Sequence, residues 1–240
     1  MKVAVIVFPG TNCDRDTKWA FETIGAKADF IWHSEEKLDN YDLVVLPGGF
    51  SYGDYLRSGA IARFSPIMKA VSEFANKGGY VLGICNGFQI LLESHLLPGA
   101  MTRNENLHFI SKFHHLKVIN NENKFLQNLN VGDIVNIPIA HAEGNYKADK
   151  ETLKKIYDNG QVILKYCDKD GNELNPNGSI DSIAGICNEN KNVFGLMPHP
   201  ERAMQSILGG IDGIKMIKGF LKWKIFFFFF LFLYIYWLIK

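Results

Sequence analysis

The stretch that most constrains the fold is a short apolar run that ends at a cysteine and continues at once into a helical pattern. Tyr80–Ile84 has the composition of a buried strand, and Asn86–Leu92 has the apolar spacing of a helix. Gly83 and Gly87 flank Cys85 at two residues on either side, which is the spacing of a nucleophile elbow. Such a turn is strained and close-packed, so it needs small neighbours, and the helix start behind it favours a thiolate. The alternative is a buried structural cysteine before an ordinary turn.

The first ninety residues alternate strand and helix patterns. This order predicts an α/β fold with a doubly wound, flavodoxin-like and mostly parallel sheet, whose ligands bind beyond the carboxyl ends of the strands. Pro47–Gly48–Gly49 and Cys85 both fall at such ends, so two features point to one crevice. The strands are expected at Val3–Val7, Ala28–Trp32 and Tyr41–Leu46, and the helices at Cys13–Ile24 and Pro66–Asn76.

The second half of the chain carries short strand patterns between turn-rich segments, which predicts antiparallel strands added to the same sheet. No linker-like stretch separates the halves, so we expect one domain over residues 1–220, followed by an apolar tail over 221–240. The expected strands are His108–Ile119, Ile134–Ile139, Gln161–Tyr166, Ser182–Cys187 and Asn192–Leu196.

Composition excludes several classes of function. The net charge is +1, which gives no electrostatic basis for binding nucleic acid. The chain begins with a strand pattern instead of a signal peptide, and its four cysteines lack metal-like or redox-like pairing, so a cytoplasmic location is expected. We predict no metal site, because the adjacent pair His114–His115 lies in a strand pattern typical of structural histidines.

A histidine between two prolines ends the last strand pattern. The prolines exclude a helix through His199 and present it on a rigid turn, and Glu201 follows at a distance that can hold one imidazole tautomer. With Cys85 they supply the nucleophile, base and orienting carboxylate of acyl transfer. Backbone N–H groups of Gly48 or Gly49 and of Asn86 would form the oxyanion hole. A surface turn with a chance histidine is the alternative.

Five segments together resemble one enzyme family. The elbow Gly-Ile-Cys-Asn-Gly-Phe-Gln and the late Pro-His-Pro-Glu resemble the class I, triad-type glutamine amidotransferases. Within that class, the pattern is similar to the glutaminase subunits of phosphoribosylformylglycinamidine synthase. The segments run in order over residues 1 to 220 and are Phe8–Asp14, Pro47–Arg57, the elbow, Ala140–Gly144 and Met197–Arg202.

The resemblance implies hydrolysis of L-glutamine to glutamate and ammonia by Cys85, His199 and Glu201. Gln89 would contact the substrate, and Gly144 with its neighbours would hold the α-amino and carboxylate ends of glutamine. Ammonia would pass to a separate ATP-dependent synthetase subunit, bridged by a small third subunit, that converts formylglycinamide ribonucleotide to the amidine. This chain would need no cofactor, and ATP and magnesium are expected on the partner. The alternatives are a glutaminase subunit serving another acceptor and a non-catalytic docking subunit.

Two stretches stand outside this chemistry. Phe50–Arg63 is aromatic and glycine-spaced, and we interpret it as part of the docking surface for the synthetase, with a lid or Ω-loop as the alternative. The other cysteines are expected to be packing residues, Cys13 being the one near the crevice.

From Ile225 to Ile239 the chain is apolar without a break, which is short of a full membrane span at about 1.5 Å of helical rise per residue. Three interpretations of this tail stay open. They are a reading-frame artefact, which we favour, a membrane contact, and a packed or oligomerising helix.

Overall fold

A nine-stranded mixed sheet forms the centre of the protein, whose computed structural model describes residues 1–222. Five parallel strands make one half of it, in the spatial order β2-β1-β3-β4-β11, and four antiparallel strands, β10-β9-β6-β7, continue it. The parallel strands are β1 (Lys2–Val7), β2 (Lys27–Trp32), β3 (Leu43–Leu46), β4 (Tyr80–Ile84) and β11 (Val193–Leu196). The antiparallel strands are β6 (Ile110–Val118), β7 (Ile134–His141), β9 (Val162–Cys167) and β10 (Ile183–Cys187). The predicted α/β fold with a parallel half and added antiparallel strands is confirmed.

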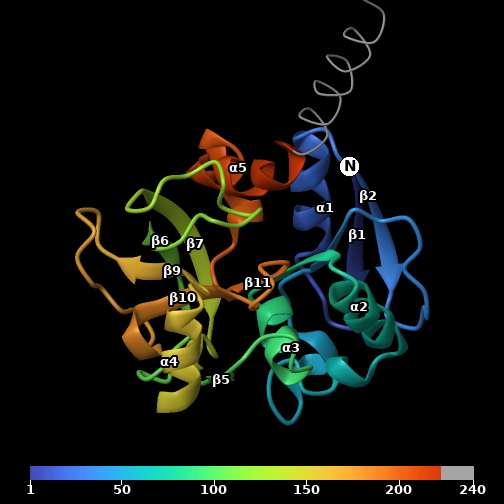
Figure 1. The fold of residues 1–240 in the computed structure, drawn as a ribbon, viewed down its shortest axis with the longest axis horizontal. Coiled ribbons are helices and arrows are strands. Elements are labelled where there is room, and N and C mark those ends of the chain that lie inside the picture. The colour runs from blue at the N-terminus through green and yellow to red at the C-terminus, as the bar shows by residue number, and fades with distance from the viewer. Residues whose placement is uncertain (223–240) are drawn as a thin grey trace, which may run out of the picture.

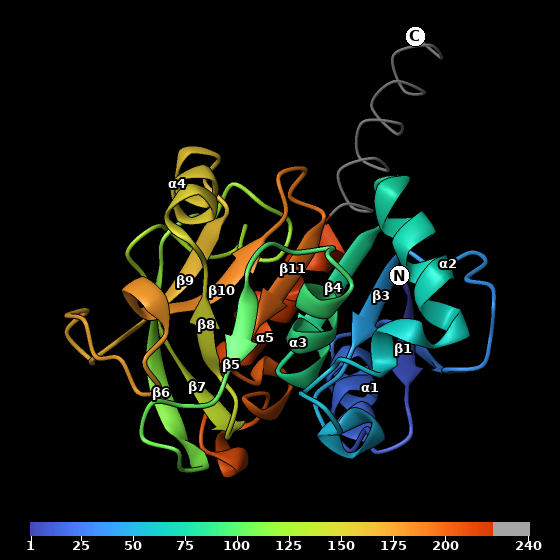
Figure 2. The same ribbon diagram turned by 90° about the horizontal axis from the view of Figure 1, so that it is seen from below.

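Helices cover both faces of this sheet, which explains why its central strands are apolar throughout. Strand β3 is buried at every position, and so are the four inner residues of β1. Helices α1 (Asp14–Thr23) and α5 (Asp212–Ile217) lie on one face, and α2 (Pro66–Asn76), α3 (Asn86–Glu93) and α4 (Lys150–Asp158) lie on the other (Figure 1). A two-stranded ribbon of β5 (Ala100–Thr102) and β8 (Asn145–Lys147) lies beside α3 (Figure 2).

The register of the parallel half places the functional segments at one edge. Strand β11 pairs with β4 so that Leu196 lies opposite Ile84. Cys85 and the residues after Leu196 therefore leave the sheet side by side. Loops that follow β1 and β3 leave the sheet at the same carboxyl edge, which is where ligands bind in doubly wound folds.

Several expectations outside the site can now be compared with the structure. The imidazole of His114 is hydrogen-bonded at 2.9 Å to the carbonyl of Leu174, as expected of a structural histidine. Helix α4 was not predicted, although Asp149 caps it by accepting a hydrogen bond from the backbone of Thr152. No helix within residues 1–222 has the length and hydropathy needed to cross a membrane. The apolar run from Ile225 to Ile239 lies outside the described residues.

Candidate active site

Cys85 lies on a strained turn between β4 and α3. Its backbone angles are φ 50° and ψ −105°, which a residue with a side chain adopts at a cost of about 1–3 kcal/mol. The flanking glycines make the turn sterically possible. A Cβ on Gly83 would lie 2.7 Å from the backbone of Gly87, and one on Gly87 would lie 1.8 Å from the carbonyl oxygen of Leu46. The close packing expected of a nucleophile elbow is therefore present.

His199 and Glu201 form a buried pair directly after β11. Nδ1 of His199 is 2.7 Å from a carboxylate oxygen of Glu201, and each residue is 1% exposed. The backbone N–H of His199 donates to Pro138 on β7, which fixes the turn to the sheet. With Nδ1 engaged by the carboxylate, Nε2 is the nitrogen left for proton transfer, and it has no hydrogen-bond partner among the described residues.

Opposing effects act on the pKa of His199. Burial by itself lowers this pKa, because it penalises the charged imidazolium. The charges of Glu201 and Cys85, together with hydrogen bonding to Cys13 and Cys85, outweigh burial, so that the pKa lies well above its ordinary value of 6.5. An imidazolium beside a cysteine is the partner that a nucleophilic thiolate requires.

A cavity of about 310 Å³ contains both Cys85 and His199. This volume is within the range of small-molecule sites. The Sγ atom of Cys85 lies 3.7 Å from the carbonyl oxygen of Ala140, at the end of β7, which also lines the cavity. A larger open hollow of about 750 Å³, lined by Arg63, Ser72 and His95 among others, contains none of the predicted site residues.

Of the three residues expected at the oxyanion hole, Gly49 lines the cavity and Gly48 and Asn86 do not. Gly49 has φ at +144°, a conformation that favours glycine. Gly48 lies against the base, since a Cβ there would be 2.7 Å from Cε1 of His199. Asn86 is the first residue of α3, so its backbone N–H has no acceptor within the helix.

A chain of side-chain hydrogen bonds supports the first turn of α3. Oδ1 of Asn86 accepts from the backbone of Ser51 at 3.1 Å, and Nδ2 of Asn86 donates to Gln89 at 2.9 Å. Gln89 in turn donates to the carbonyl oxygen of Glu143 at 2.6 Å and lines the cavity. The side chains of Asn86 and Gln89 therefore hold the elbow against two neighbouring loops.

Gly144 does not line the cavity. Its N–H donates to Asn104 at 2.9 Å, and its carbonyl oxygen accepts from Asn177 at 2.7 Å and from Ser179 at 3.1 Å. These bonds give Gly144 a structural part, which sequence reasoning did not anticipate. Its predecessors Ala142 and Glu143 do line the cavity.

Comparison with known proteins shows the family of this chain. Residues 1–227 match the family of CobB/CobQ-like glutamine amidotransferase domains. The chain belongs to this glutamine amidotransferase family. It is 66% identical over 223 residues to the phosphoribosylformylglycinamidine synthase subunit PurQ of Sulfurimonas denitrificans, covering 92% of this chain and 100% of that protein. It is 61% identical over 221 residues to the protein of the same name from Campylobacter jejuni, covering 92% and 96%.

Solved structures give the same fold. The structure of PurLQS from Thermotoga maritima superposes on the amidotransferase with a TM-score of 0.84 at 43% identity, covering 92% of this chain and 98% of that one. A glutamine amidotransferase from the same organism superposes with a TM-score of 0.54 at 18% identity, covering 84% of this chain and 76% of that one. The second match is a likeness of fold alone.

Two carboxylates at the cavity were missed from the sequence. Asp54 and Glu143 both line it, and Ser58 donates to Glu143 from its hydroxyl at 2.7 Å and from its backbone at 3.3 Å. The pKa of Asp54 is raised from 3.8 to about 6. Burial is the largest cause and the charge of Glu143 adds to it, while hydrogen bonds from Ser58 and Asn86 act in the opposite direction. These residues lie in loops far apart in the chain, so no local pattern connects them.

Replacing Asp54 with Asn tests this charge through the pH dependence of stability. A pKa raised on folding makes the protonated carboxyl stabilising below pH 3.8, and this stability is lost as the pH rises to about 6. The variant lacks this loss, so its free energy of unfolding relative to wild type should increase between pH 4 and pH 7. Urea unfolding of both proteins at the two pH values measures the change. If the free energies of unfolding of variant and wild type differ by the same amount at both pH values, the assigned pKa is contradicted.

Cys13 is buried as expected of a packing residue, but its contacts are polar. Nη2 of Arg202 donates to its Sγ atom at 3.0 Å, and Nε of the same guanidinium donates to Asp16 at 3.2 Å. Both Cys13 and Arg202 line the amidotransferase cavity. The sequence signal was the position of Cys13 after the first strand, at the edge where the site lies.

Proposed function

We propose that this chain hydrolyses L-glutamine to glutamate and ammonia. The observation that carries the proposal is the convergence, at one cavity, of a cysteine on a strained elbow and a buried histidine–glutamate pair. Family membership and identity above 60% to two PurQ proteins support it.

In this proposal each group of the site has one step. The thiolate of Cys85 attacks the carboxamide carbon of glutamine, and the developing oxyanion is bound by backbone N–H groups of Gly49 and Asn86. The His199 imidazolium gives its proton to the departing nitrogen, which leaves as ammonia and produces a thioester on Cys85. His199 then takes a proton from water as the water attacks the thioester. Glutamate leaves, and the thiolate is restored. Glu201 holds the imidazole in its tautomer throughout.

The charged groups of the cavity are complementary to the α-ammonium group of glutamine. Asp54 and Glu143 supply negative charge for the α-ammonium group, and Gln89 and the loop Ala142–Glu143 supply polar contacts nearby. The cavity accommodates a molecule of this size.

The ammonia goes to a separate ATP-dependent synthetase subunit that converts formylglycinamide ribonucleotide to formylglycinamidine ribonucleotide in purine biosynthesis. The PurQ relatives and the likeness to PurLQS support this partner and a small third subunit. ATP and magnesium belong to the partner in this proposal. A cytoplasmic location completes it, and the absence of disulfides among the four cysteines is consistent with a reducing compartment.

The decisive experiment combines the chain with the synthetase, the small subunit, ATP, formylglycinamide ribonucleotide and glutamine. Amidine formation that depends on both glutamine and this chain supports the proposal. Glutamate release without amidine would instead favour another acceptor, and complex formation without glutamate release would favour a docking subunit.

The loop after β3 is the surface that we propose for docking. Tyr55 and Leu56 on this loop are 74% and 89% exposed, while Arg57 is held by Glu93 of α3 through bonds of 2.5 and 2.7 Å. Reversing the charge of Arg57 would therefore disturb the loop itself, and Leu56 is the cleaner probe.

Leu56→Asp is expected to weaken binding of the synthetase by about 10-fold or more, because it would place an unpaired carboxylate in the interface and burying such a charge is costly. Isothermal titration of the variant against the synthetase measures this. Ile207→Asp is a matched control, since Ile207 is equally exposed on a different segment. Equal binding by wild type and Leu56→Asp would rule out this loop as a docking element.

A further inference from the structure

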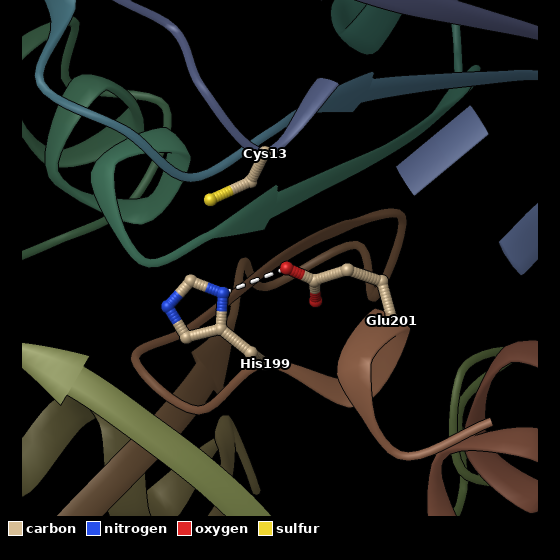
Figure 3. A group of neighbouring side chains, drawn as sticks. All are labelled: Cys13, His199 and Glu201. Carbon is tan, nitrogen blue, oxygen red and sulfur yellow. Dashed lines mark hydrogen bonds and ion pairs between the residues drawn. The ribbon is translucent and has the colours of Figure 1, made fainter. Parts of the chain in front are cut away.

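Three side chains of types that can ligate a metal lie together at the edge of the cavity. Cys13 comes from the loop after β1, and His199 and Glu201 come from the turn after β11. One ligand atom from each, the thiol sulfur, a ring nitrogen and a carboxylate oxygen, lies within 4.8 Å of the other two. Figure 3 shows the sulfur of Cys13 directed toward the imidazole, which is itself bonded to Glu201.

The donor set is the one that zinc prefers. Sulfur, imidazole nitrogen and carboxylate oxygen are its usual ligands, and three protein ligands leave a fourth position for water. All three residues are at most 2% exposed. Two atoms in the cluster, Nε2 of His199 and Oε2 of Glu201, have no hydrogen-bond partner among residues 1–222. A buried polar atom without a hydrogen-bond partner lowers the stability of the fold. A cation held by the cluster would give these atoms a partner.

Arg202 contacts the sulfur of this cluster and also has a partner outside it. Its guanidinium donates at 3.0 Å to Sγ of Cys13, and metal binding would release the proton of this thiol. The same guanidinium also bonds Asp16 at 3.2 Å. Cys13 can therefore exchange Arg202 for a metal while Arg202 keeps a carboxylate partner.

We propose that Cys13, His199 and Glu201 form a binding site for Zn²⁺ and related thiophilic divalent cations, and that its occupation switches off the cysteine chemistry. An imidazole that ligates a metal has lost a lone pair, so it no longer serves as the base for Cys85. The binding of metal does not depend on the proposed glutaminase function, and each can fail without the other.

The test measures zinc binding directly in the full-length chain. Cys85→Ala is used as the background, so that the nucleophile itself cannot ligate. Zn²⁺ is titrated in competition with a chromophoric chelator, and Co²⁺ is substituted to detect a thiolate-to-metal absorption band. We expect one Zn²⁺ per chain and a cobalt–thiolate band.

Adding Cys13→Ala to this background should weaken zinc binding by at least about 100-fold, the upper end of what loss of an outer-shell partner costs, and remove the band. Cys167→Ala in the same background is the matched control, because Cys167 is equally buried but lies in β9, outside the cluster. If Cys13→Ala does not fold, judged by thermal melting, Cys13→Ser replaces it with a closer isostere. Zinc binding that survives loss of the Cys13 thiol, or its absence from the Cys85→Ala chain, overturns the proposal.

Discussion

Replacing Cys85 with Ala is expected to lower glutamine hydrolysis by at least about 10⁴-fold, because loss of a triad nucleophile removes the covalent route as a whole. Cys13 is the other thiol that lines the cavity, but it accepts a hydrogen bond from Arg202 and does not lie on the strained turn. Glutamate release by the purified complex measures the effect.

Ammonia supplied from solution provides the control for this variant. The acceptor chemistry belongs to the synthetase in our proposal, so Cys85→Ala in the complex should still form amidine from free ammonia at the wild-type rate. Cys167→Ala, which removes a buried thiol from β9, should retain glutamine hydrolysis. Glutamate release by Cys85→Ala within 10-fold of wild type, a margin well inside the expected loss of roughly 10⁴-fold, would remove Cys85 from the nucleophile role.

Gly87→Ala is expected to destabilise the protein by about 3 kcal/mol or more, the upper range for overpacking a close contact. The added Cβ would lie 1.8 Å from the carbonyl oxygen and 2.6 Å from the carbonyl carbon of Leu46. Both are backbone atoms of β3, so α3 and β3 would have to separate. For a chain of this size the melting temperature should fall by roughly 6–12 °C.

The sign of this change distinguishes packing from helix propensity. Gly87 lies inside α3, and propensity alone predicts that Ala would stabilise the helix by about 1 kcal/mol. In calorimetry, overpacking would lower the melting temperature of Gly87→Ala, whereas helix propensity alone would raise it. Gly132→Ala is the control, because its φ is +91° and an added Cβ would meet nothing within 4 Å. It should cost about 1–2 kcal/mol through backbone conformation alone.

Local patterns predicted much of this molecule. The apolar run before Cys85 and the apolar spacing after it were sufficient to place a strand, a tight turn and a helix, because each depends on neighbouring residues. The Pro-His-Pro-Glu turn was predicted for the same reason, and its histidine and glutamate do form a hydrogen bond.

Contacts between distant segments could not be predicted in this way. Nothing in the residues around Cys13 indicates that Arg202 will donate to its sulfur, and nothing around Ser58 indicates a bond to Glu143. Gly144 was expected to contact substrate, but its backbone groups are used by Asn104 and Asn177, which lie elsewhere in the chain. These pairings arise from strand order, which a single sequence does not specify.

The pairing of β11 with β4 has a consequence for the growing chain on the ribosome. The cysteine is synthesised early, but its base is carried on a turn that follows Val193–Leu196, a strand inserted beside β4 only after most of the chain exists. A nascent or prematurely terminated chain that lacks β11 thus carries the thiol without its base. Only a nearly complete chain can bring the two together.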